Sequence, residues 1–288
     1  MMSGCFGIVG CGYVGSAVAS YFRSKGFEVT GTTRNPSRLT YICDFVDHPR
    51  IYRAEDSEAD VSFLDGLDGL LIAVAPTLTD SQEDTYQMVY GKGVPALINS
   101  LNQRSTDRPL HVIYLSSAGV YGNQGGAMCD EITPPDRSHS NNAILAGAED
   151  AVLSLNSSSI NSCILRLGGI YGPNKDIASF ICSASGQIIP KNGDHIKAWI
   201  HLNDIIYGVY FAFQNRLEGI YNLVDDLQLS RRDLSNMLCA RMGIAPVIWD
   251  NYDQPDSHIF HARVSNSKLR ALGFQPSVRS MFDFLVAA

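Results

Sequence analysis

The sequence predicts an α/β fold built on a doubly wound parallel sheet. Continuous apolar runs at residues 6–9, 70–75 and 110–115 are typical of parallel strands that are buried on both faces. Helical patterns, with apolar residues three and four positions apart, separate these runs. Strands that alternate with helices in this way form βαβ units, in which the strands run in one direction.

The first strand runs directly into a glycine-rich turn, Gly10-x-Gly12-x-x-Gly15, and then into a helical pattern. This order of strand, turn and helix is the context of a dinucleotide-binding motif. Gly10 permits the tight turn, Gly12 lets the backbone approach a pyrophosphate, and Gly15 lets the helix pack on the strand. The helix N-terminus offers unpaired N–H groups to that pyrophosphate. We expect a Rossmann fold with a dinucleotide cofactor; the alternative is a glycine turn without a ligand.

The second expected strand, residues 28–33, ends in Thr33 and Arg34, with Arg38 one turn later. Folds that prefer NAD place Asp or Glu here, about 20 residues beyond the glycines, to bind the ribose 2′-hydroxyl. This segment has no acidic residue, and a guanidinium group suits a 2′-phosphate by charge and geometry. The sequence therefore favours NADP over NAD as the cofactor. The alternative is that Arg34 is a solvated loop residue.

The residues expected to bind the cofactor share a place at the carboxyl ends of the strands, where ligands of such sheets lie. They are Gly10, Gly12, Tyr13, Val14, Gly15, Thr33, Arg34, Arg38, Ala73, Val74, Ala75 and Ser116.

Composition excludes several classes of protein. The chain has 288 residues, of which 45% are hydrophobic and 18% charged, as in ordinary globular proteins. A formal net charge of −7, without runs of Lys or Arg, argues against binding to nucleic acid or a membrane surface. Seven cysteines without CxxC spacing, most of them in apolar stretches, indicate buried free thiols rather than disulfides or metal ligands. With no signal peptide or membrane-length apolar run, we expect a cytoplasmic protein without a metal.

Four later segments follow one another in an order known from one protein family. They are YLSSAGVYG at residues 114–122, LRLGGIYGP at residues 165–173, WIHLNDI at residues 199–205 and GIYNL at residues 219–223. With the glycine turn, they resemble the extended short-chain dehydrogenase/reductase family, which includes NAD-dependent sugar-nucleotide epimerases and dehydratases. The turn GCGYVG is shorter than that of most extended members and is more similar to the atypical subgroup. The resemblance covers nearly the whole chain.

The resemblance implies a Rossmann domain and a smaller C-terminal substrate lobe. The first would comprise residues 1–169 plus 200–226, and the lobe residues 170–199 plus 227–288. Lys175 and Lys197 lie near positions where relatives bind a substrate phosphate, which an ammonium group can neutralise. The alternative is that both are solvated surface lysines.

The main departure from the family lies in the expected active site. Relatives use a strand-end Ser or Thr and a Tyr-x-x-x-Lys pair on the next helix, and Ser117 matches the serine. When Ala148-Glu149 is aligned with the family's A-E, Asn141 stands at the tyrosine position and Leu145 at the lysine position. Neither side chain can transfer a proton near neutral pH.

Three nearby residues are candidates for the missing proton-transfer group: Ser117, Tyr121 and His139. Histidine titrates near neutral pH, whereas a serine orients a carbonyl without supplying a proton. The alternative for His139 is an exposed loop histidine. The Asp-Glu pair of dehydratases is replaced by Ala118-Gly119, which disfavours a dehydratase.

Two functions stay open. The first is an atypical NADP-dependent oxidoreductase or epimerase that acts on a small or nucleotide-linked carbonyl or sugar substrate; the glycine turn, Arg34 and Ser117 support it. The second is a catalytically inactive NADP-binding sensor or scaffold, which Asn141 and Leu145 support. Fold analogy does not decide between them. Relatives often dimerise through the helix expected at residues 141–155, so a homodimer is a further expectation.

Overall fold

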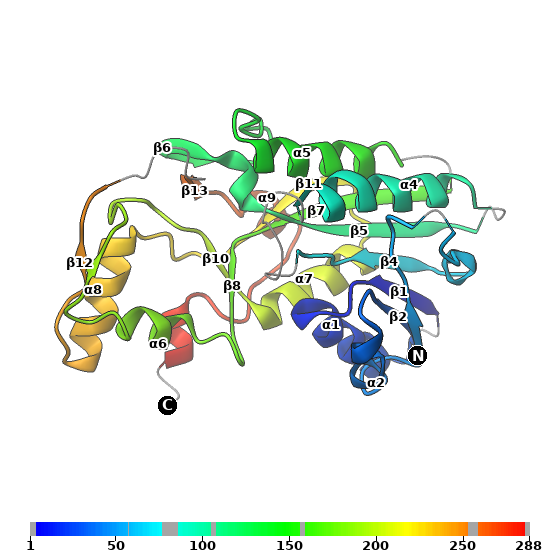
Figure 1. Ribbon diagram of the computed structural model, residues 1–288, viewed down its shortest axis with the longest axis horizontal. Helices are drawn as coiled ribbons and strands as arrows, with labels where there is room; N and C mark the ends of the chain where they lie inside the picture. The colour runs from blue at the N-terminus through cyan, green and yellow to red at the C-terminus, as the bar shows by residue number, and fades with distance from the viewer. Residues whose placement is uncertain are drawn as a thin grey trace. The chain divides into compact units, whose positions relative to one another are not determined.

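The computed structural model describes residues 4–56, 58–76, 86–104, 108–155, 159–252 and 259–285. Its central feature is a seven-stranded sheet with the strand order β11-β7-β5-β4-β1-β2-β3 (Figure 1). The strands are β1 Cys5–Val9, β2 Glu28–Thr33, β3 His48–Ile51, β4 Gly69–Ile72, β5 Leu110–Ser117, β7 Ile160–Leu167 and β11 Gly219–Leu223. The β1–β2, β1–β4, β2–β3 and β4–β5 ladders are parallel. The predicted doubly wound parallel sheet is therefore confirmed.

The chain divides into two compact units. The first comprises Met1–Ser116, Ala143–Leu165 and Ile206–Tyr221; the second comprises Ser117–Asn142, Arg166–Ile205 and Asn222–Ala288. The helices that cover the sheet are α1 Tyr13–Ser24, α2 Leu39–Ile42, α4 Val94–Asn102, α5 Ser140–Leu153 and α7 Leu202–Gln214. In the described part of the chain, no helix is both long and apolar enough to cross a membrane.

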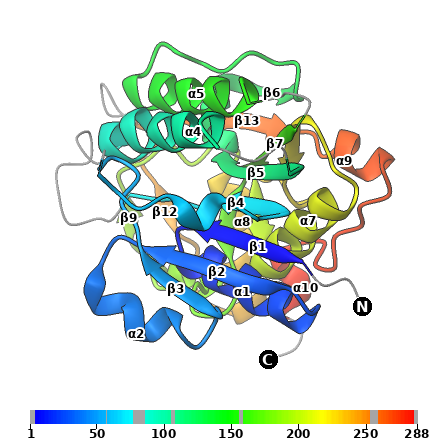
Figure 2. The ribbon, with the colours of Figure 1, turned by 90° about the vertical axis from the view of Figure 1, so that its right-hand side faces the viewer.

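Two apolar layers hold the first unit together. On one face of the sheet, α4 and α5 pack against the strands through residues such as Leu97 and Val152 (Figure 2). On the other face, Phe6 of β1 stacks on Phe22 of α1 at a centroid distance of 3.8 Å, and Phe213 of α7 meets Phe6 edge-on at 5.3 Å. Aromatic pairs of this kind stabilise a core beyond the area that they bury.

The turn before α4 is a π-helix, Gln87–Gly93. Pro95 explains part of this departure from an ordinary helix, because it has no N–H to donate to the carbonyl of Gly91. Tyr86, which directly precedes this wider turn, and Tyr90, within it, have rings 5.3 Å apart. Turns of this kind are frequent at functional sites.

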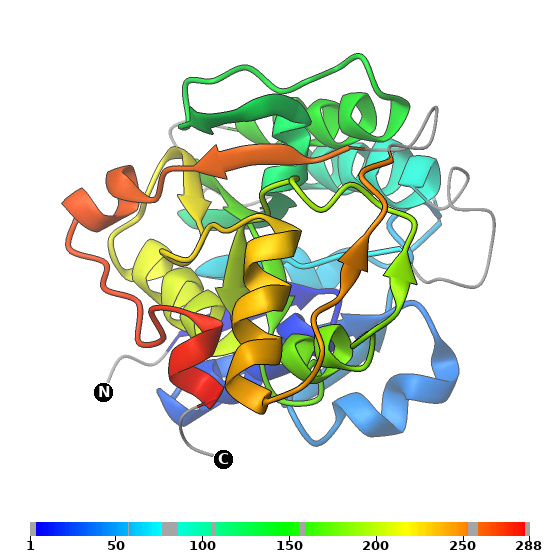
Figure 3. The ribbon, with the colours of Figure 1, turned by 90° about the vertical axis from the view of Figure 1, so that its left-hand side faces the viewer.

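The second unit consists of short elements (Figure 3). They are β6 Asn123–Cys129, β8 Gly169–Tyr171, α6 Ile177–Cys182, β9 Ile188–Ile189, β10 Trp199–His201, α8 Arg231–Met242, β12 Ile248–Trp249, β13 His261–Val264, α9 Ser267–Ala271 and α10 Met281–Leu285. Three parallel pairs, β10–β8, β12–β9 and β13–β6, connect distant parts of the chain.

Two fully buried carboxylates bind loops of the second unit. Asp204 Oδ1 accepts hydrogen bonds from the backbone N–H and the hydroxyl of Ser277, both at 2.6 Å. Asp225 accepts hydrogen bonds from the Leu227 N–H at 3.0 Å and from the Tyr171 hydroxyl at 3.1 Å. Desolvation outweighs these bonds and raises the pKa of Asp225 to about 7.

We expect Asp225→Asn to flatten the pH dependence of stability. Because the pKa of Asp225 is raised, its contribution to folding is present below its ordinary pKa and is lost as the pH rises to about 7. Between about pH 5 and about pH 8, this loss is on the order of 2–3 kcal/mol in the free energy of unfolding. Urea denaturation of the wild type and the variant at both pH values measures it. Asp226→Asn, which alters an exposed ion pair with Arg270, is the matched control. Equal pH dependence in the wild type and Asp225→Asn would contradict the prediction.

Candidate functional site

The strand order reverses at β1 and β4, so the segments that follow these two strands lie side by side. The Ala73 N–H donates to the Val9 carbonyl at 2.9 Å and extends the ladder past β4. Gly10 has φ +103°, and a Cβ at this position would lie 2.7 Å from the Ala73 carbonyl oxygen. Both the backbone conformation and the close approach therefore require glycine at position 10.

The other two glycines of the turn differ in the space around the position that a Cβ atom would occupy. A Cβ at position 15 would lie 2.2 Å from the Gly10 carbonyl oxygen, so a side chain there would push α1 away from β1. A Cβ at position 12 would meet no atom within 4 Å. Gly12 is also the N-cap of α1 and makes no side-chain cap bond. The fold needs Gly10 and Gly15, whereas the open space at Gly12 fits a pyrophosphate at the N-terminus of α1.

Positive charge lies at the end of β2. Arg34 extends toward the segment after β4, where its Nη2 atom lies 3.4 Å from the Ala75 carbonyl oxygen. The Arg38 guanidinium lies over the Tyr41 ring at 5.0 Å. Thr33 is buried, and its hydroxyl accepts a hydrogen bond from the Asn35 N–H at 3.2 Å, which shapes the turn. Arg34 therefore contacts the same segment after β4 that Gly10 approaches closely.

The remaining residues predicted to bind the cofactor lie near this turn or at strand ends. Tyr13 and Val14 are half-buried in the first turn of α1, and Ala73 and Val74 are half-buried after β4. Ser116 is buried at the end of β5.

Two contacts in the same unit bear on these residues. The Ser116 hydroxyl donates to the buried carboxylate of Glu149 at 2.6 Å, so this group is already engaged within the core. Tyr90, which the sequence analysis did not select, lies near Arg34: burial raises the pKa of its phenol, and the charge of Arg34 opposes that shift. In the sequence, the signal that could have drawn attention to Tyr90 is the run Gly91, Gly93 and Pro95, which interrupts the helical pattern directly after it.

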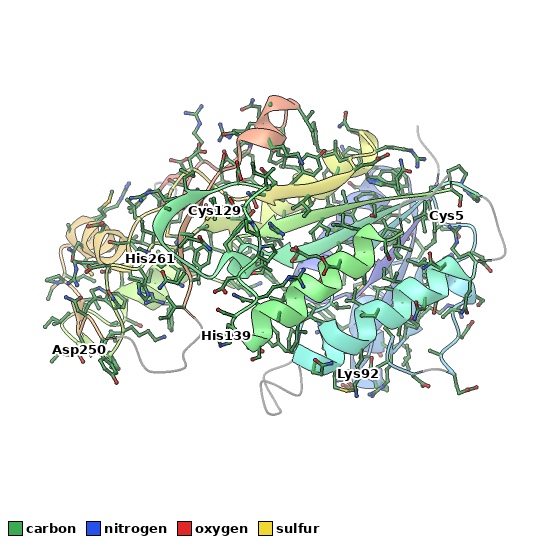
Figure 4. The ribbon with its side chains drawn as sticks, turned by 90° about the horizontal axis from the view of Figure 1, so that it is seen from above. Cys5, Lys92, Cys129, His139, Asp250 and His261 are labelled. Carbon is green, nitrogen blue, oxygen red and sulfur yellow. The ribbon has the colours of Figure 1, made fainter. Side chains whose placement is uncertain are left out.

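The second unit holds the candidates for proton transfer. Ser117 is half-buried, and its Oγ accepts a hydrogen bond from the Gly119 N–H at 3.0 Å. A hydroxyl that accepts in this way can still donate its proton to a substrate oxygen. His139 is half-buried and lies at the N-terminal end of α5 (Figure 4). Asn141 is half-buried and Leu145 is buried, at the two positions where relatives carry tyrosine and lysine.

Tyr121 is part of the core of the second unit. It is fully buried, and its hydroxyl lies 2.8 Å from Asn222 Oδ1 and 2.9 Å from the Asp130 carbonyl oxygen, both acceptors. The Arg166 guanidinium lies 4.9 Å from the centre of its ring. Burial raises the pKa of the Tyr121 phenol. These contacts suit a structural tyrosine better than a proton donor.

The two predicted substrate lysines lie in different environments. Lys175 is exposed in a tight turn, where its N–H donates to the Gly172 carbonyl at 2.9 Å. Lys197 is half-buried; its Nζ donates to the Phe260 carbonyl at 3.1 Å and lies 5.0 Å from the centre of the Phe260 ring. Desolvation, with Arg231 and Lys191 nearby, lowers the pKa of Lys197 to about 7. Lys197 is therefore not a solvated surface lysine.

Further basic side chains lie close to Lys197, and the sequence analysis did not select them. The His195 and His261 rings stack at 5.0 Å, and the Nδ1 atom of His261, which is labelled in Figure 4, accepts a hydrogen bond from the Ile196 N–H at 3.1 Å. Arg231 Nη1 lies 3.4 Å from His195 Nδ1. We call these four residues, His195, Lys197, Arg231 and His261, the basic cluster. Positive charge on Lys197 and Arg231 in a partly buried place favours an anion as ligand.

Comparisons with known proteins agree with this geometry. The sequence profile of the NAD dependent epimerase/dehydratase family matches residues 8–223. Protein YeeZ of Escherichia coli K12 is 27% identical over 245 residues, which cover 83% of this chain and 84% of YeeZ.

Solved structures show the same fold. A Methylobacillus flagellatus protein, provisionally assigned to the NAD-dependent epimerases/dehydratases, is 26% identical with a TM-score of 0.75, over 99% of this chain and 97% of that chain. The UDP-glucose 4-epimerase of Thermus thermophilus, solved with NAD, is 20% identical with a TM-score of 0.77, over 95% of this chain and 94% of that chain. The family profile spans the glycine turn, the strand-end serine and the last strand of the sheet. The resemblance seen in the sequence is thereby confirmed, and the chain belongs to the NAD dependent epimerase/dehydratase family.

Proposed function

We propose that the protein is an NADP-dependent oxidoreductase or epimerase that acts on a small or nucleotide-linked carbonyl or sugar substrate. The observation that carries this proposal is that Arg34 contacts the segment after β4, which also approaches Gly10 of the glycine turn, while a Cβ at Gly12 would meet no protein atom.

NADP fits the residues present at the ends of β1 and β2. The backbone at Gly12 and the first N–H groups of α1 would hold the pyrophosphate. Arg34 and Arg38 would hold the 2′-phosphate, because NAD-preferring relatives need an acidic residue where this chain has Thr33 and Arg34. The bound cofactor supplies the hydride-transfer chemistry, and the protein supplies orientation and electrostatics.

The basic cluster supports an anionic group on the substrate. Lys197 and Arg231 provide positive charge in a partly desolvated site, where the attraction to a phosphate or carboxylate is stronger than in water. The Thermus thermophilus relative is a UDP-glucose epimerase, and a nucleotide-linked sugar carries such a group. Phosphate binding would keep Lys197 in its charged form and oppose the shift that burial causes.

Ser117 and His139 suit two distinct roles in this reaction. The Ser117 hydroxyl can donate to a substrate oxygen while Gly119 holds it in place. His139 is the remaining titratable candidate, since the Tyr121 hydroxyl is engaged by Asn222 and Asp130. We assign substrate orientation to Ser117 and proton transfer to His139.

The second candidate function is an inactive NADP-binding sensor or scaffold. Asn141 and Leu145 support this candidate. They stand where relatives carry the tyrosine that transfers the proton and the lysine beside it. A homodimer through α5 stays a proposal under either function.

We expect Arg34→Ala to weaken NADPH binding by about 10- to 100-fold, because it removes charged hydrogen bonds to the 2′-phosphate. NADH affinity should be unchanged, since NADH has no such phosphate. Fluorescence titration with both nucleotides measures the effect. The matched control is Arg23→Ala, which changes an exposed arginine in the last turn of α1 that forms an ion pair with Asp47. Tighter binding of NADH than of NADPH by the wild type would contradict the NADP assignment.

A turnover assay separates the enzyme from the sensor. With NADPH and a panel of aldehydes and ketones, we expect slow oxidation of NADPH by the wild type. With NADP⁺ and nucleotide-linked sugars, the epimerised sugar is measured instead, because epimerisation leaves the cofactor unchanged overall. We expect either rate to fall by about 10²-fold or more in His139→Gln. His48→Gln, an exposed histidine paired with Glu28, should behave like the wild type. Tight NADPH binding without turnover of any substrate would favour the sensor. Equal turnover by the wild type and His139→Gln would remove the role assigned to His139.

A further inference from the structure

The glycine turn after β1 is held against β2, the neighbouring strand of the sheet (Figure 2). The Gly10 N–H donates a hydrogen bond to the Thr32 hydroxyl at 3.2 Å, and the Cys11 N–H donates to the Thr32 carbonyl at 2.8 Å. Thr32 is 1% exposed, so solvent has little access to either acceptor. A single residue of β2 therefore accepts hydrogen bonds from two successive backbone groups of the turn.

The register of the sheet explains why Thr32 makes these contacts. Val9, the last residue of β1, lies opposite Thr32 in the parallel β1–β2 ladder. Where β1 ends, the chain therefore leaves the ladder beside Thr32, and the next two N–H groups meet its hydroxyl and its carbonyl. Arg34, which we propose to bind the 2′-phosphate, follows two residues later. Thr32 thus stands between the two parts of the proposed cofactor site.

Packing and a further hydrogen bond fix the turn in the same place. A Cβ at Gly31 would lie 2.6 Å from Cys11 Sγ, so Gly31 leaves the space that the buried Cys11 side chain occupies. Within the turn, the Gly12 N–H donates to the Gly10 carbonyl at 2.8 Å. The N–H groups of Gly10, Cys11 and Gly12 are therefore all engaged within the protein, and the shape of the turn is set without a ligand.

We propose that Thr32 is a positioning residue for the dinucleotide, whose hydroxyl fixes the glycine turn in the shape that the pyrophosphate requires. The inference rests on the proposed function, because it needs the cofactor at this turn. The hydroxyl acts through the Gly10 N–H and does not itself contact the cofactor. A loop that is already ordered loses less conformational entropy when a ligand binds, and this raises the affinity. Because NADPH and NADH share the pyrophosphate, Thr32 contributes equally to the binding of both.

We expect Thr32→Val to lower the affinity for NADPH and for NADH by the same factor, about 3- to 10-fold, because one hydrogen bond that orders the turn is lost. Valine keeps the branched shape of threonine and removes the hydroxyl. Arg34→Ala, in contrast, is expected to lower the affinity for NADPH alone. Calorimetric titration with each nucleotide, at a temperature well below the Tm of every variant, measures the effect on the folded protein.

Two further variants serve as controls in this titration. Thr32→Ser keeps the hydroxyl and should bind both nucleotides about as tightly as the wild type. Thr30→Val makes the same change as Thr32→Val two residues earlier in β2, where Thr30 lies opposite Gly7 of β1 and away from the turn. It should leave both affinities unchanged.

Amide hydrogen exchange of the nucleotide-free protein gives a readout that does not depend on the cofactor. In Thr32→Val, the Gly10 amide has lost its acceptor and should exchange faster than in the wild type or in Thr32→Ser. An equal exchange rate in the wild type and Thr32→Val would show that the hydroxyl does not order the turn, and would overturn the proposal.

The titrations separate the failure of this inference from the failure of the proposed function. A wild type that binds neither nucleotide would overturn both. A wild type that binds NADPH, beside a Thr32→Val variant with unchanged affinity for both nucleotides, would overturn the positioning role alone; a lowered Tm in that variant would then assign Thr32 a purely structural role. A loss of affinity for NADPH without a loss for NADH would also contradict the proposal, because it would place the effect at the 2′-phosphate instead of the turn.

Discussion

The structure depends on the close approach of the turn after β1 to α1 and to the segment after β4. Gly10 and Gly15 are required by this contact, because a side chain at either position would collide with backbone at 2.7 Å or 2.2 Å. The approach brings the N-terminus of α1, Ala75 and Arg34 to one end of the sheet. Gly12 lies in the same turn but is not needed for it. The turn thus holds two glycines that the fold requires and one, Gly12, that it does not require and that we propose to lie against the cofactor.

The second unit uses buried polar groups where the first uses aromatic packing. Short strands and helices cannot bury much apolar surface, so Asp204, Asp225 and Asn222 bind its loops through hydrogen bonds. Charge left partly desolvated in such a unit is costly unless a ligand compensates it. Desolvation lowers the pKa of Lys197, which is a sign of that cost and agrees with the anionic substrate that we propose.

Much of the fold could be predicted from the sequence, because continuous apolar runs and a glycine turn act locally. Ser117 and Lys197 could be found by resemblance, since each lies at a fixed distance from a recognisable segment. His195 and His261 could not, because their stacking depends on a contact between residues 66 positions apart. Tyr121 was selected as a possible acid because it follows Ser117 closely; its burial depends on Asn222, about a hundred residues later. The two-residue strands β9 and β12 are too short to leave a periodic pattern.

The central claim, that Gly12 is reserved for a cofactor, is tested most directly by calorimetric titration of Gly12→Ala with NADPH beside its thermal melt. The φ of Gly12, −86°, is one that alanine adopts, and the added Cβ meets no protein atom. We therefore predict an unchanged Tm and an NADPH affinity lowered by about tenfold or more, because the methyl group enters the space where the pyrophosphate approaches the backbone. Wild-type affinity in this variant would contradict the account.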